Sequence, residues 1–346
     1  MAGRPVRTLL ILEPTLQCNS RCRTCYNRDK LNTRGAVLSL EAIERIAEAL
    51  PNLLVLELSG GEPFLHPQLV EMIDAFAART SVRIVSVPTN GLATNTIVTR
   101  TREILQTFRG ELAVGLSIDA IAQRHDEIRG VEGNFEALCR TYDALAALKG
   151  QHPRLHISAN TCISSYNAAS YRDVQEWVEQ HWPLAEGHSL SLARSVPAGE
   201  TAVDAVDFLS REGAHLARSG RRRKGYRLGI VGRLNSMFWG WYYRQALRHH
   251  RGLPRQWACS AGRGSLYINA LGQVHACEML EPIGSLTDPP AALDDVLNSA
   301  RALAQCRTIA SRGCSCDHSC FMQHSAFTMP GNITLWLRGV LGGGKR

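Results

Sequence analysis

The chain has 346 residues, of which 45% are apolar and 20% are charged, and its formal net charge is +8. These values are typical of a folded protein with one large domain or two ordinary ones, and they exclude a disordered or low-complexity chain. The mild basic bias is compatible with an anionic ligand, but no nucleic-acid-binding motif accompanies it, so we expect no nucleic-acid partner.

The first apolar segment is predicted to be a strand, not a targeting signal. Residues 9–12 are apolar, but Glu13 and Pro14 interrupt the run and no small-residue cleavage site follows. No stretch of about 18 apolar residues is present that could span a membrane. We therefore expect a cytoplasmic protein, in which thiols stay reduced.

Strands and helices alternate through residues 7–195. The helix expected at 38–50 has Ser39 as its N-cap and Pro51 as its stop signal. This alternation predicts parallel strands joined by right-handed crossovers. Six units are too few for an eight-unit barrel, so we predict an α/β fold with a partial (β/α)6 barrel and ligand chemistry at the carboxyl ends of the strands. The six strands are expected at 7–13, 53–59, 82–91, 111–119, 153–164 and 187–195.

Three further segments follow the predicted barrel of residues 1–195. Residues 196–255 contain a basic run, RSGRRRKGYR, and an aromatic-rich stretch, LNSMFWGWYYRQALRHH. We favour a helix that bridges two domains and buries its aromatic side chains; the alternative is a lid or a surface for an anionic or lipid-linked substrate, with peripheral membrane contact. Residues 256–330 form a small Cys-rich module with a hairpin that turns at Leu271-Gly272, and 331–346 form a tail.

The eleven cysteines fall into two groups. Three lie in residues 18–25 and six in 259–320, whereas Cys139 and Cys162 stand alone. Two dense groups in a reducing compartment suggest two metal sites and not a disulfide framework. Cys139 falls on a helical pattern and is interpreted as a core thiol.

The first group, CNSRCRTC, follows the first predicted strand directly and contains Cys18, Cys22 and Cys25. A structural zinc site requires four protein ligands, and only three are found locally. A 4Fe–4S cluster can use three thiolates and leave one iron open to a cofactor or substrate. The spacing therefore favours an iron–sulfur cluster.

This motif resembles the signature of the radical S-adenosylmethionine (SAM) superfamily. The resemblance implies that the three cysteines hold three irons of a 4Fe–4S cluster, while the amino and carboxylate groups of SAM chelate the fourth. Thr24 stands where the family usually has an aromatic residue, and Tyr26 is expected to cover the cluster instead.

Further motifs of this family follow in order at the predicted strand ends. The resemblance implies that GGEP receives the SAM amino group, that PTNG lies beside the nucleoside, that SID lies by the ribose, and that the arginine of HDEIRG pairs with the SAM carboxylate. The cofactor-binding residues predicted in this way are Gly60, Gly61, Glu62, Pro63, Thr89, Asn90, Ser117, Asp119 and Arg129.

The fifth strand adds two candidates. Since side chains alternate between faces, His156, Ser158, Asn160 and Cys162 share one face, and their polarity suggests that this face lines the barrel lumen. Asn160 is a candidate contact for SAM or substrate. Cys162 could donate a hydrogen atom to a substrate radical, although the ordinary interpretation is a small core thiol.

The second group of thiols is divided between a hairpin and a loop. Cys259 and Cys277 flank the hairpin, and the arrangement resembles the auxiliary-cluster extension called SPASM or, in its shorter form, twitch. The resemblance implies one auxiliary 4Fe–4S cluster; a zinc knuckle is the alternative. Cys306 lies in a helical stretch and could be core. The expected ligands are Cys259, Cys277, Cys316 and Cys320, with Cys314 as the rival.

These features predict an enzyme of the oxidoreductase or isomerase type that cleaves SAM reductively to a 5′-deoxyadenosyl radical and abstracts hydrogen from a substrate C–H bond. A flavodoxin or ferredoxin would supply electrons. The cluster motif begins at residue 18, which leaves no room before it for a peptide-recognition domain. We therefore expect oxidation or epimerisation of a small molecule, sugar or lipid-linked substrate. The alternatives are a peptide-modifying maturase and a non-catalytic zinc or iron–sulfur module.

Overall fold

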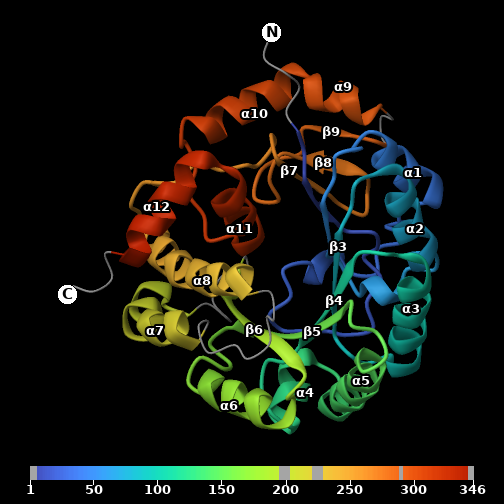
Figure 1. The fold of residues 1–346 in the computed structure, drawn as a ribbon, viewed down its shortest axis with the longest axis vertical. Helices are drawn as coiled ribbons and strands as arrows, with labels where there is room; N and C mark the ends of the chain where they lie inside the picture. The colour runs from blue at the N-terminus through green and yellow to red at the C-terminus, as the bar shows by residue number, and fades with distance from the viewer. Residues whose placement is uncertain (1–5, 195–202, 220–228, 288–290, 342–346) are drawn as a thin grey trace.

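A computed structural model describes residues 6–194, 203–219, 229–287 and 291–341 of the chain. Its core is a partial barrel of six parallel strands, each followed by helical segments, as the sequence predicts (Figure 1). The strands are β1 (Leu9–Leu12), β2 (Val55–Leu58), β3 (Ile84–Thr89), β4 (Glu111–Ser117), β5 (Leu155–Ile163) and β6 (Ala185–Leu192).

The helices of the barrel form its outer layer in Figure 1. They pack through apolar residues at helical spacing, such as Ile43, Ile46 and Ala47 of α1. Ser39 is the N-cap of α1, and its hydroxyl accepts a hydrogen bond from the Ala42 amide at 3.2 Å. The helical segments are η1 (Arg28–Lys30), α1 (Leu40–Glu48), η2 (Pro63–Leu65), α2 (Leu69–Arg79), α3 (Thr94–Thr107), α4 (Gln123–Arg129), α5 (Asn134–Lys149) and α6 (Tyr171–His181).

The strand β5 separates two environments. Its odd-numbered residues are buried under the helices, and its even-numbered residues are only partly buried. The predicted alternation is therefore confirmed, and the polar face of β5 is the inner one. Ser189 and Ser191 of β6 pair with Asn160 and Cys162 and continue this polar wall.

The Cys-rich hairpin is continuous with the barrel sheet, which the sequence did not predict. Strand β7 (Ser265–Ile268) pairs with β1 in parallel, and β8 (Gln273–His275) and β9 (Gly284–Ser285) extend the sheet with antiparallel pairs. The order is β6-β5-β4-β3-β2-β1-β7-β8-β9. The predicted turn at Leu271-Gly272 is confirmed; Gly272 has a φ of 75°, a value that glycine adopts readily.

Helix α8 (Gly229–His250) bridges the barrel and the Cys-rich segment. The Tyr243 hydroxyl donates to the Leu190 carbonyl of β6, and the Tyr242 hydroxyl donates to the Asp317 carbonyl in the Cys-rich loop. Among its described side chains, Phe238 and Trp241 are buried in a cluster with Phe208 of α7 (Ala205–Ser219). The bridging interpretation of the aromatic stretch stays a prediction that these contacts support, whereas most of the basic run lies outside the described residues.

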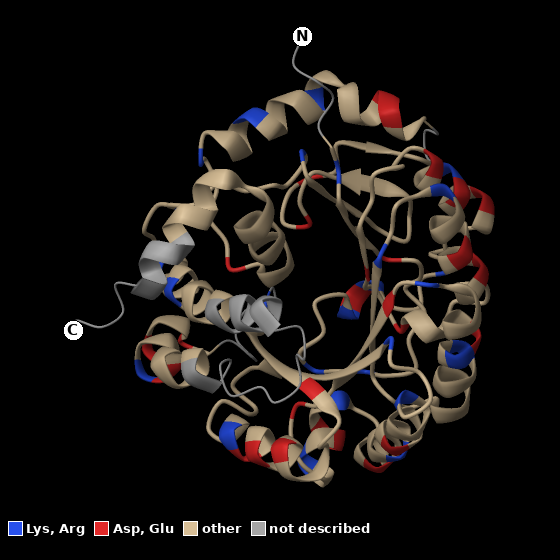
Figure 2. Cartoon of the chain, in the orientation of Figure 1, with Lys and Arg blue, Asp and Glu red and all other residues tan. Residues whose placement is uncertain are grey.

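The remaining helices lie along the top (α9, α10) and on the left (α11, α12) of the molecule in Figure 1. They are α9 (Leu293–Asn298), α10 (Ala300–Ala310), α11 (Ser319–Thr328) and α12 (Pro330–Leu341). Acidic and basic residues lie side by side on the outer helices in Figure 2, as in the ion pair of Arg79 with Glu44 at 2.8 Å. Within the described ranges, every helix is too short or too polar to cross a membrane.

Candidate active site

The three early cysteines lie on one loop between β1 and η1. All three are free thiols and are only partly buried. Burial raises the pKa of Cys18 and of Cys25 to about 11, and the neighbouring thiols add to this effect. Because a bound metal deprotonates a coordinating thiol outright, the loop can present thiolates when it holds an electropositive centre.

Hydrogen-bond donors surround these sulfurs. The Ser20 amide donates to Cys18 Sγ at 3.4 Å, and the Ser20 hydroxyl lies 3.1 Å from Cys22 Sγ. Arg129 Nη1 donates to Cys22 Sγ at 3.6 Å, and Asn90 Nδ2 lies 3.9 Å from Cys18 Sγ. Such donors stabilise negative charge on sulfur and are among the features that tune an iron–sulfur cluster.

The loop is held by the carboxyl end of α4. The amides of Arg21 and Arg23 donate to the carbonyls of Arg129 and Ile128, at 3.1 and 2.8 Å. Gly130 follows with a φ of 68°, and a Cβ there would lie 2.6 Å from the Arg21 carbonyl oxygen. The glycine of the HDEIRG motif thus allows the close approach of the helix end to the cysteine loop.

The GGEP turn lies against the other side of the loop. The Gly61 amide donates to Thr15 O at 2.9 Å, and the Glu62 amide donates to Gln17 O at 2.8 Å. A Cβ at Gly60 would lie 2.5 Å from Thr15 O, so this contact requires glycine. Pro63, the last residue of the motif, begins η2 and is buried.

Glu62 is a buried carboxylate beside this loop. Burial raises its pKa to about 7, against the effect of its hydrogen bonds. Its Oε2 accepts the Asn90 amide at 2.8 Å, and its Oε1 accepts the Phe64 amide at 3.3 Å. Asn90 follows Thr89 at the end of β3, so Glu62 joins the ends of β2 and β3.

Asp119 and Arg129 form a buried ion pair across the end of β4. Arg129 Nε lies 2.8 Å from Asp119 Oδ2, and the two side chains are 12% and 0% exposed. Asp119 Oδ1 also accepts the Cys162 amide at 2.8 Å. Burial works against the charge of Arg129, but Asp119 and the Cys22 sulfur raise its pKa, so the guanidinium stays charged.

The structure brings most of the sequence-predicted residues to one end of the sheet. Ser117 ends β4, and Asn160 of β5 lies against Gly115, where a Cβ would clash with its amide nitrogen. Cys162 lies beside Asp119 and Arg129, and burial raises its thiol pKa to about 12. Tyr26 is 41% exposed, and its hydroxyl lies 2.7 Å from Ser59 Oγ at the end of β2.

The second group of thiols is less uniform than predicted. Burial raises the pKa of Cys259, Cys277 and Cys316. Cys259 and Cys316 raise that of Cys277 further, Cys259 and Cys314 raise that of Cys316, and Cys314 raises that of Cys259. Burial and a hydrogen bond with Glu57 of β2 raise the pKa of Cys320, and none of the groups that affect it most is a thiol. Cys306 lies away from these thiols, against Gly262.

In the part of the chain that the structure describes, the three side chains whose ligand atoms lie within 4.8 Å of one another are His249, His250 and Asp317.

Several lumen residues carry no sequence motif. Glu13 accepts a hydrogen bond from Asn27 Nδ2 at 2.8 Å, and Glu278 contacts the buried His318. Arg194 lies near Glu278, Cys320 and Asp317, and its buried Nη1 makes no hydrogen bond with any described residue. Glu278 could have been noticed because it directly follows Cys277; no comparable signal marks Arg194.

Comparison with known proteins identifies the family of this part of the chain. The profile of the family described as the radical SAM superfamily matches residues 12–158. That range contains the cysteine loop and every strand-end motif discussed above. The chain therefore contains a radical SAM domain, and the cofactors of that domain are SAM and a 4Fe–4S cluster.

The names of two relatives refer to the biosynthesis of a bacteriocin and the maturation of a killing factor. The antilisterial bacteriocin subtilosin biosynthesis protein AlbA of Bacillus subtilis is 33% identical over 138 residues, which are 39% of this chain and 29% of AlbA. The sporulation killing factor maturation protein SkfB, also of Bacillus subtilis, is 25% identical over 316 residues, which are 88% of this chain and 68% of SkfB. This chain thus spans less than a third of AlbA.

A solved structure shows the same fold over nearly the whole chain. Native anSMEcpe with bound AdoMet and the Cp18Cys peptide superposes with a TM-score of 0.59, at 14% identity, over 96% of this chain and 99% of anSMEcpe. The partial barrel with its Cys-rich extension is confirmed by this likeness. The relatives favour the peptide alternative over the small-molecule, sugar or lipid-linked substrate that the sequence led us to expect.

Proposed function

Because residues 12–158 are a radical SAM domain, we propose that this chain is a radical SAM enzyme that modifies a peptide in the lumen of its partial barrel. The observation that carries the proposal is the set of three free thiols on one loop, surrounded by hydrogen-bond donors and by buried polar and charged groups that follow β2, β3 and β4. Such an arrangement suits an incompletely ligated cluster that shares its open iron with a chelating cofactor.

The cofactor-binding roles follow from charge. Cys18, Cys22 and Cys25 would hold the cluster. A carboxylate of SAM would find the charged guanidinium of Arg129 beside the cluster loop, oriented by Asp119. The SAM ammonium would pair with the carboxylate of Glu62. Burial disfavours ionisation of Glu62, and the charge of the bound ammonium would favour it.

The cluster and SAM, when bound, supply an electron and a 5′-deoxyadenosyl radical that can remove hydrogen from an unactivated C–H bond. The protein's part is to keep water from this radical and to position the substrate. The inner faces of β5 and β6 carry small polar residues, Ser158, Asn160, Ser189 and Ser191, which leave space and can hydrogen-bond a peptide backbone.

The Cys-rich segment would hold one auxiliary 4Fe–4S cluster. Its four sulfurs would come from Cys259, Cys277 and two of the three thiols of the CSCDHSC loop, Cys314, Cys316 and Cys320. Since β7 pairs with β1, the hairpin that carries Cys277 is joined to the strand that precedes the first cluster loop. This continuity suits a cluster that accepts an electron from the substrate radical or anchors the substrate.

A peptide substrate is favoured by the relatives. AlbA takes part in biosynthesis of a bacteriocin and SkfB in maturation of a killing factor, and SkfB aligns with 88% of this chain. The reaction could then be an oxidation, in which the peptide loses two hydrogens, or an epimerisation, in which a carbon regains hydrogen from a donor such as Cys162. A flavodoxin or ferredoxin would be the reductant.

The proposal is tested by anaerobic incubation of the fully loaded enzyme with SAM, dithionite and short peptides encoded beside its gene. We expect 5′-deoxyadenosine together with one peptide that becomes two hydrogens lighter, or one that keeps its mass in H2O and gains one deuterium in D2O. If a loaded first cluster gives no 5′-deoxyadenosine, the chain is a non-catalytic iron–sulfur module. If 5′-deoxyadenosine forms but no peptide changes, only the substrate class is wrong.

A further inference from the structure

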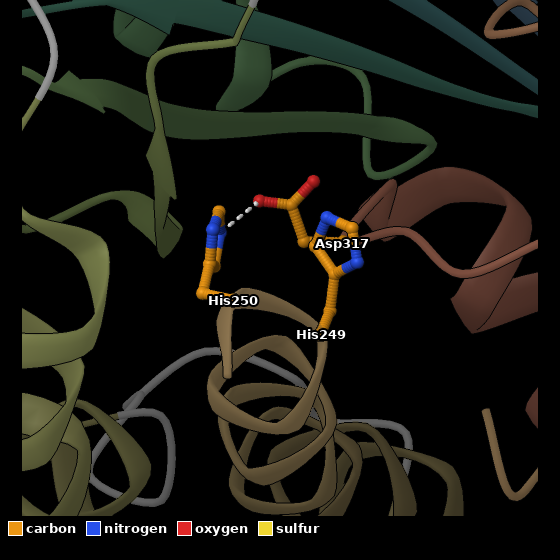
Figure 3. A group of neighbouring side chains, drawn as sticks. All are labelled: His249, His250 and Asp317. Atoms are coloured by element: carbon orange, nitrogen blue, oxygen red, sulfur yellow. Dashed lines mark hydrogen bonds and ion pairs between the residues drawn. The ribbon is translucent and has the colours of Figure 1, made fainter. Parts of the chain in front are cut away.

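A second cluster of metal-binding side chains lies where α8 ends against the Cys-rich loop. His249 and His250 are the last two residues of α8, and Asp317 lies in the loop between Cys316 and His318. Figure 3 shows the two imidazoles on either side of the Asp317 carboxylate. One ligand atom from each residue lies within 4.8 Å of the other two.

The geometry of each side chain leaves a nitrogen or oxygen directed at the centre of this group. His250 Nε2 lies 3.0 Å from Asp317 Oδ2. His249 Nδ1 lies 3.2 Å from the Ser315 hydroxyl, which leaves the other ring nitrogen free to bind. A metal-binding histidine almost always uses its second nitrogen for such an outer hydrogen bond, and this bond fixes the ring orientation.

Adjacent histidines on a regular helix point about 100° apart and seldom share a ligand. Here the two rings have their centroids 4.9 Å apart and an interplanar angle of 58°, and the chain turns away from the helix directly after His250. The convergence of both rings on one carboxylate is therefore a specific feature of this helix end. Asp317 is 8% exposed and His250 is 27% exposed, so the centre is reachable from solvent on the histidine side.

The charge of the group suits a divalent cation. Asp317 supplies a carboxylate from the loop, and its Oδ2 lies 3.0 Å from the Nε2 atom of His250. Two neutral imidazoles and one carboxylate are the ligand set of many zinc and non-haem iron sites. Bonds of about 2.0–2.2 Å would require only small rotations of rings that already lie this close.

We propose that His249, His250 and Asp317 bind one divalent transition-metal ion, zinc or ferrous iron, separate from both iron–sulfur clusters. Three protein ligands leave positions for water. The ion would join the end of α8 to the Cys314–Cys320 loop, next to the hydrogen bond from Tyr242 to the Asp317 carbonyl. Its role would be to fix the loop that carries auxiliary-cluster thiols, a role that does not depend on the substrate of the enzyme.

The test uses the full-length enzyme with both clusters loaded, so that the cluster thiols are occupied. Zinc binding is measured by equilibrium dialysis and metal analysis in wild type and in His249→Ala, His250→Ala and Asp317→Asn. We expect one zinc per chain beyond the iron. Each substitution should weaken zinc binding at least about 10- to 100-fold, because loss of even an outer-shell partner has an effect of that size.

The matched control is His152→Ala, which removes a histidine after the end of α5, at the opposite end of the sheet. It should bind zinc like wild type. Iron and sulfide contents are measured in every variant. If Asp317→Asn loses the auxiliary cluster, zinc binding by His249→Ala and His250→Ala still tests the proposed site. Cobalt(II) serves as a spectroscopic probe, and we expect ligand-field bands without a thiolate-to-cobalt charge-transfer band.

Four results would overturn the assignment. Wild type could bind no more zinc than His249→Ala and His250→Ala do. The control could lose zinc as they do. Cobalt could show thiolate charge transfer, which would place the ion on cysteines and not on this group. Retained zinc in both α8 variants with intact clusters would have the same meaning.

Discussion

The two cysteine regions of the molecule are built in opposite ways. The first places three thiols within eight residues of one loop, and the surrounding strand ends supply polar and charged partners such as Asn90 and Arg129. The second gathers thiols from the two ends of the hairpin and, about 40 residues after Cys277, from the loop before α11 and the first turn of α11. Local spacing defines the first site, and tertiary assembly defines the second.

This difference has a functional consequence. The first site has hydrogen-bond donors around its sulfurs, as suits a cluster that also binds a cofactor. Burial raises the pKa of Cys277 above its usual range and that of Cys316 to about 12, and tyrosine and tryptophan residues of α8 pack nearby. The second site is therefore packed against an aromatic cluster, whereas the first is surrounded by polar strand ends.

The largest expected effect separates the two sites directly. Replacement of Cys18, Cys22 and Cys25 by alanine should reduce 5′-deoxyadenosine formation to the reagent background, because no cluster remains to pass an electron to SAM. Iron should fall by about four atoms per chain while the auxiliary iron stays. Iron analysis and chromatography of the nucleoside measure both, and continued cleavage of SAM would place the chemistry elsewhere.

The reciprocal change should spare SAM cleavage. Cys277→Ala should lose about half of the iron and all modified peptide but keep slow 5′-deoxyadenosine formation. Cys306→Ala removes a thiol outside the predicted ligand set; this variant is the control and should keep all iron.

Comparison of Cys314→Ala with Cys320→Ala then identifies the remaining ligands, because auxiliary iron falls only when a ligand is lost. Equal iron in Cys277→Ala and wild type would contradict the auxiliary site.

The buried ion pair of Asp119 with Arg129 should contribute strongly to the free energy of unfolding. Asp119→Asn leaves the buried Arg129 guanidinium without its partner, which costs about 3–5 kcal/mol of unfolding free energy. SAM affinity should fall with it. Glu127→Gln on the same helix breaks the exposed pair with Arg124 and should cost at most about 1 kcal/mol. Denaturant unfolding at matched iron content measures the difference, and similar losses in both variants would argue against the role of the buried pair.

A pair of glycines tests the close approach of the GGEP turn to the cluster loop. Gly60 and Gly35 both have positive φ, at 98° and 79°, but only a Cβ at Gly60 meets backbone, whereas none lies within 4 Å at Gly35. Both alanine variants should lose about 1–2 kcal/mol for the left-handed conformation. Gly60→Ala should lose a further 1–3 kcal/mol, roughly, through overpacking and should hold less iron. Equal destabilisation would mean that the turn can move.

The smallest effect concerns the amino end of the sheet, away from both sites. His156 Nδ1 lies 2.6 Å from Glu186, and its Nε2 lies 2.6 Å from Glu111. The hydrogen bond with Glu186, and then that with Glu111, raise its pKa in the folded state, although burial works against them. Its contribution is therefore complete below the unfolded pKa of about 6.5 and is lost as the pH rises through the folded value.

His156→Gln should thus cost about 1 kcal/mol of unfolding free energy at pH 6 and less at pH 9. Denaturant unfolding at the two pH values gives the comparison. A variant that is equally destabilised at both values would show that the histidine acts through packing and not through charge.

The sequence predicts the barrel well because its signals are local. The alternation of His156, Ser158, Asn160 and Cys162 with apolar residues determines which face of β5 is the inner one. The strand-end motifs converge because the carboxyl ends of parallel strands meet at one edge of the sheet.

The remainder depends on contacts that no local pattern encodes. The pairing of Leu9 with Ser265 joins residues far apart in the chain, and its register is set by how the hairpin packs. The hydrogen bond between Cys320 and Glu57, and the position of Arg194 in the lumen, likewise depend on tertiary assembly. Neither Glu57 nor Arg194 belongs to a sequence motif from which its position could have been predicted.

The most direct test is electron paramagnetic resonance of the reduced enzyme in which every auxiliary cysteine is replaced by alanine, so that only the first cluster remains. SAM labelled with 15N at its amino group and 17O in its carboxylate is added anaerobically. The account predicts a changed cluster signal with hyperfine coupling to both labels, since these atoms would bind the open iron. A signal that ignores SAM, or a site that holds only zinc, would contradict it.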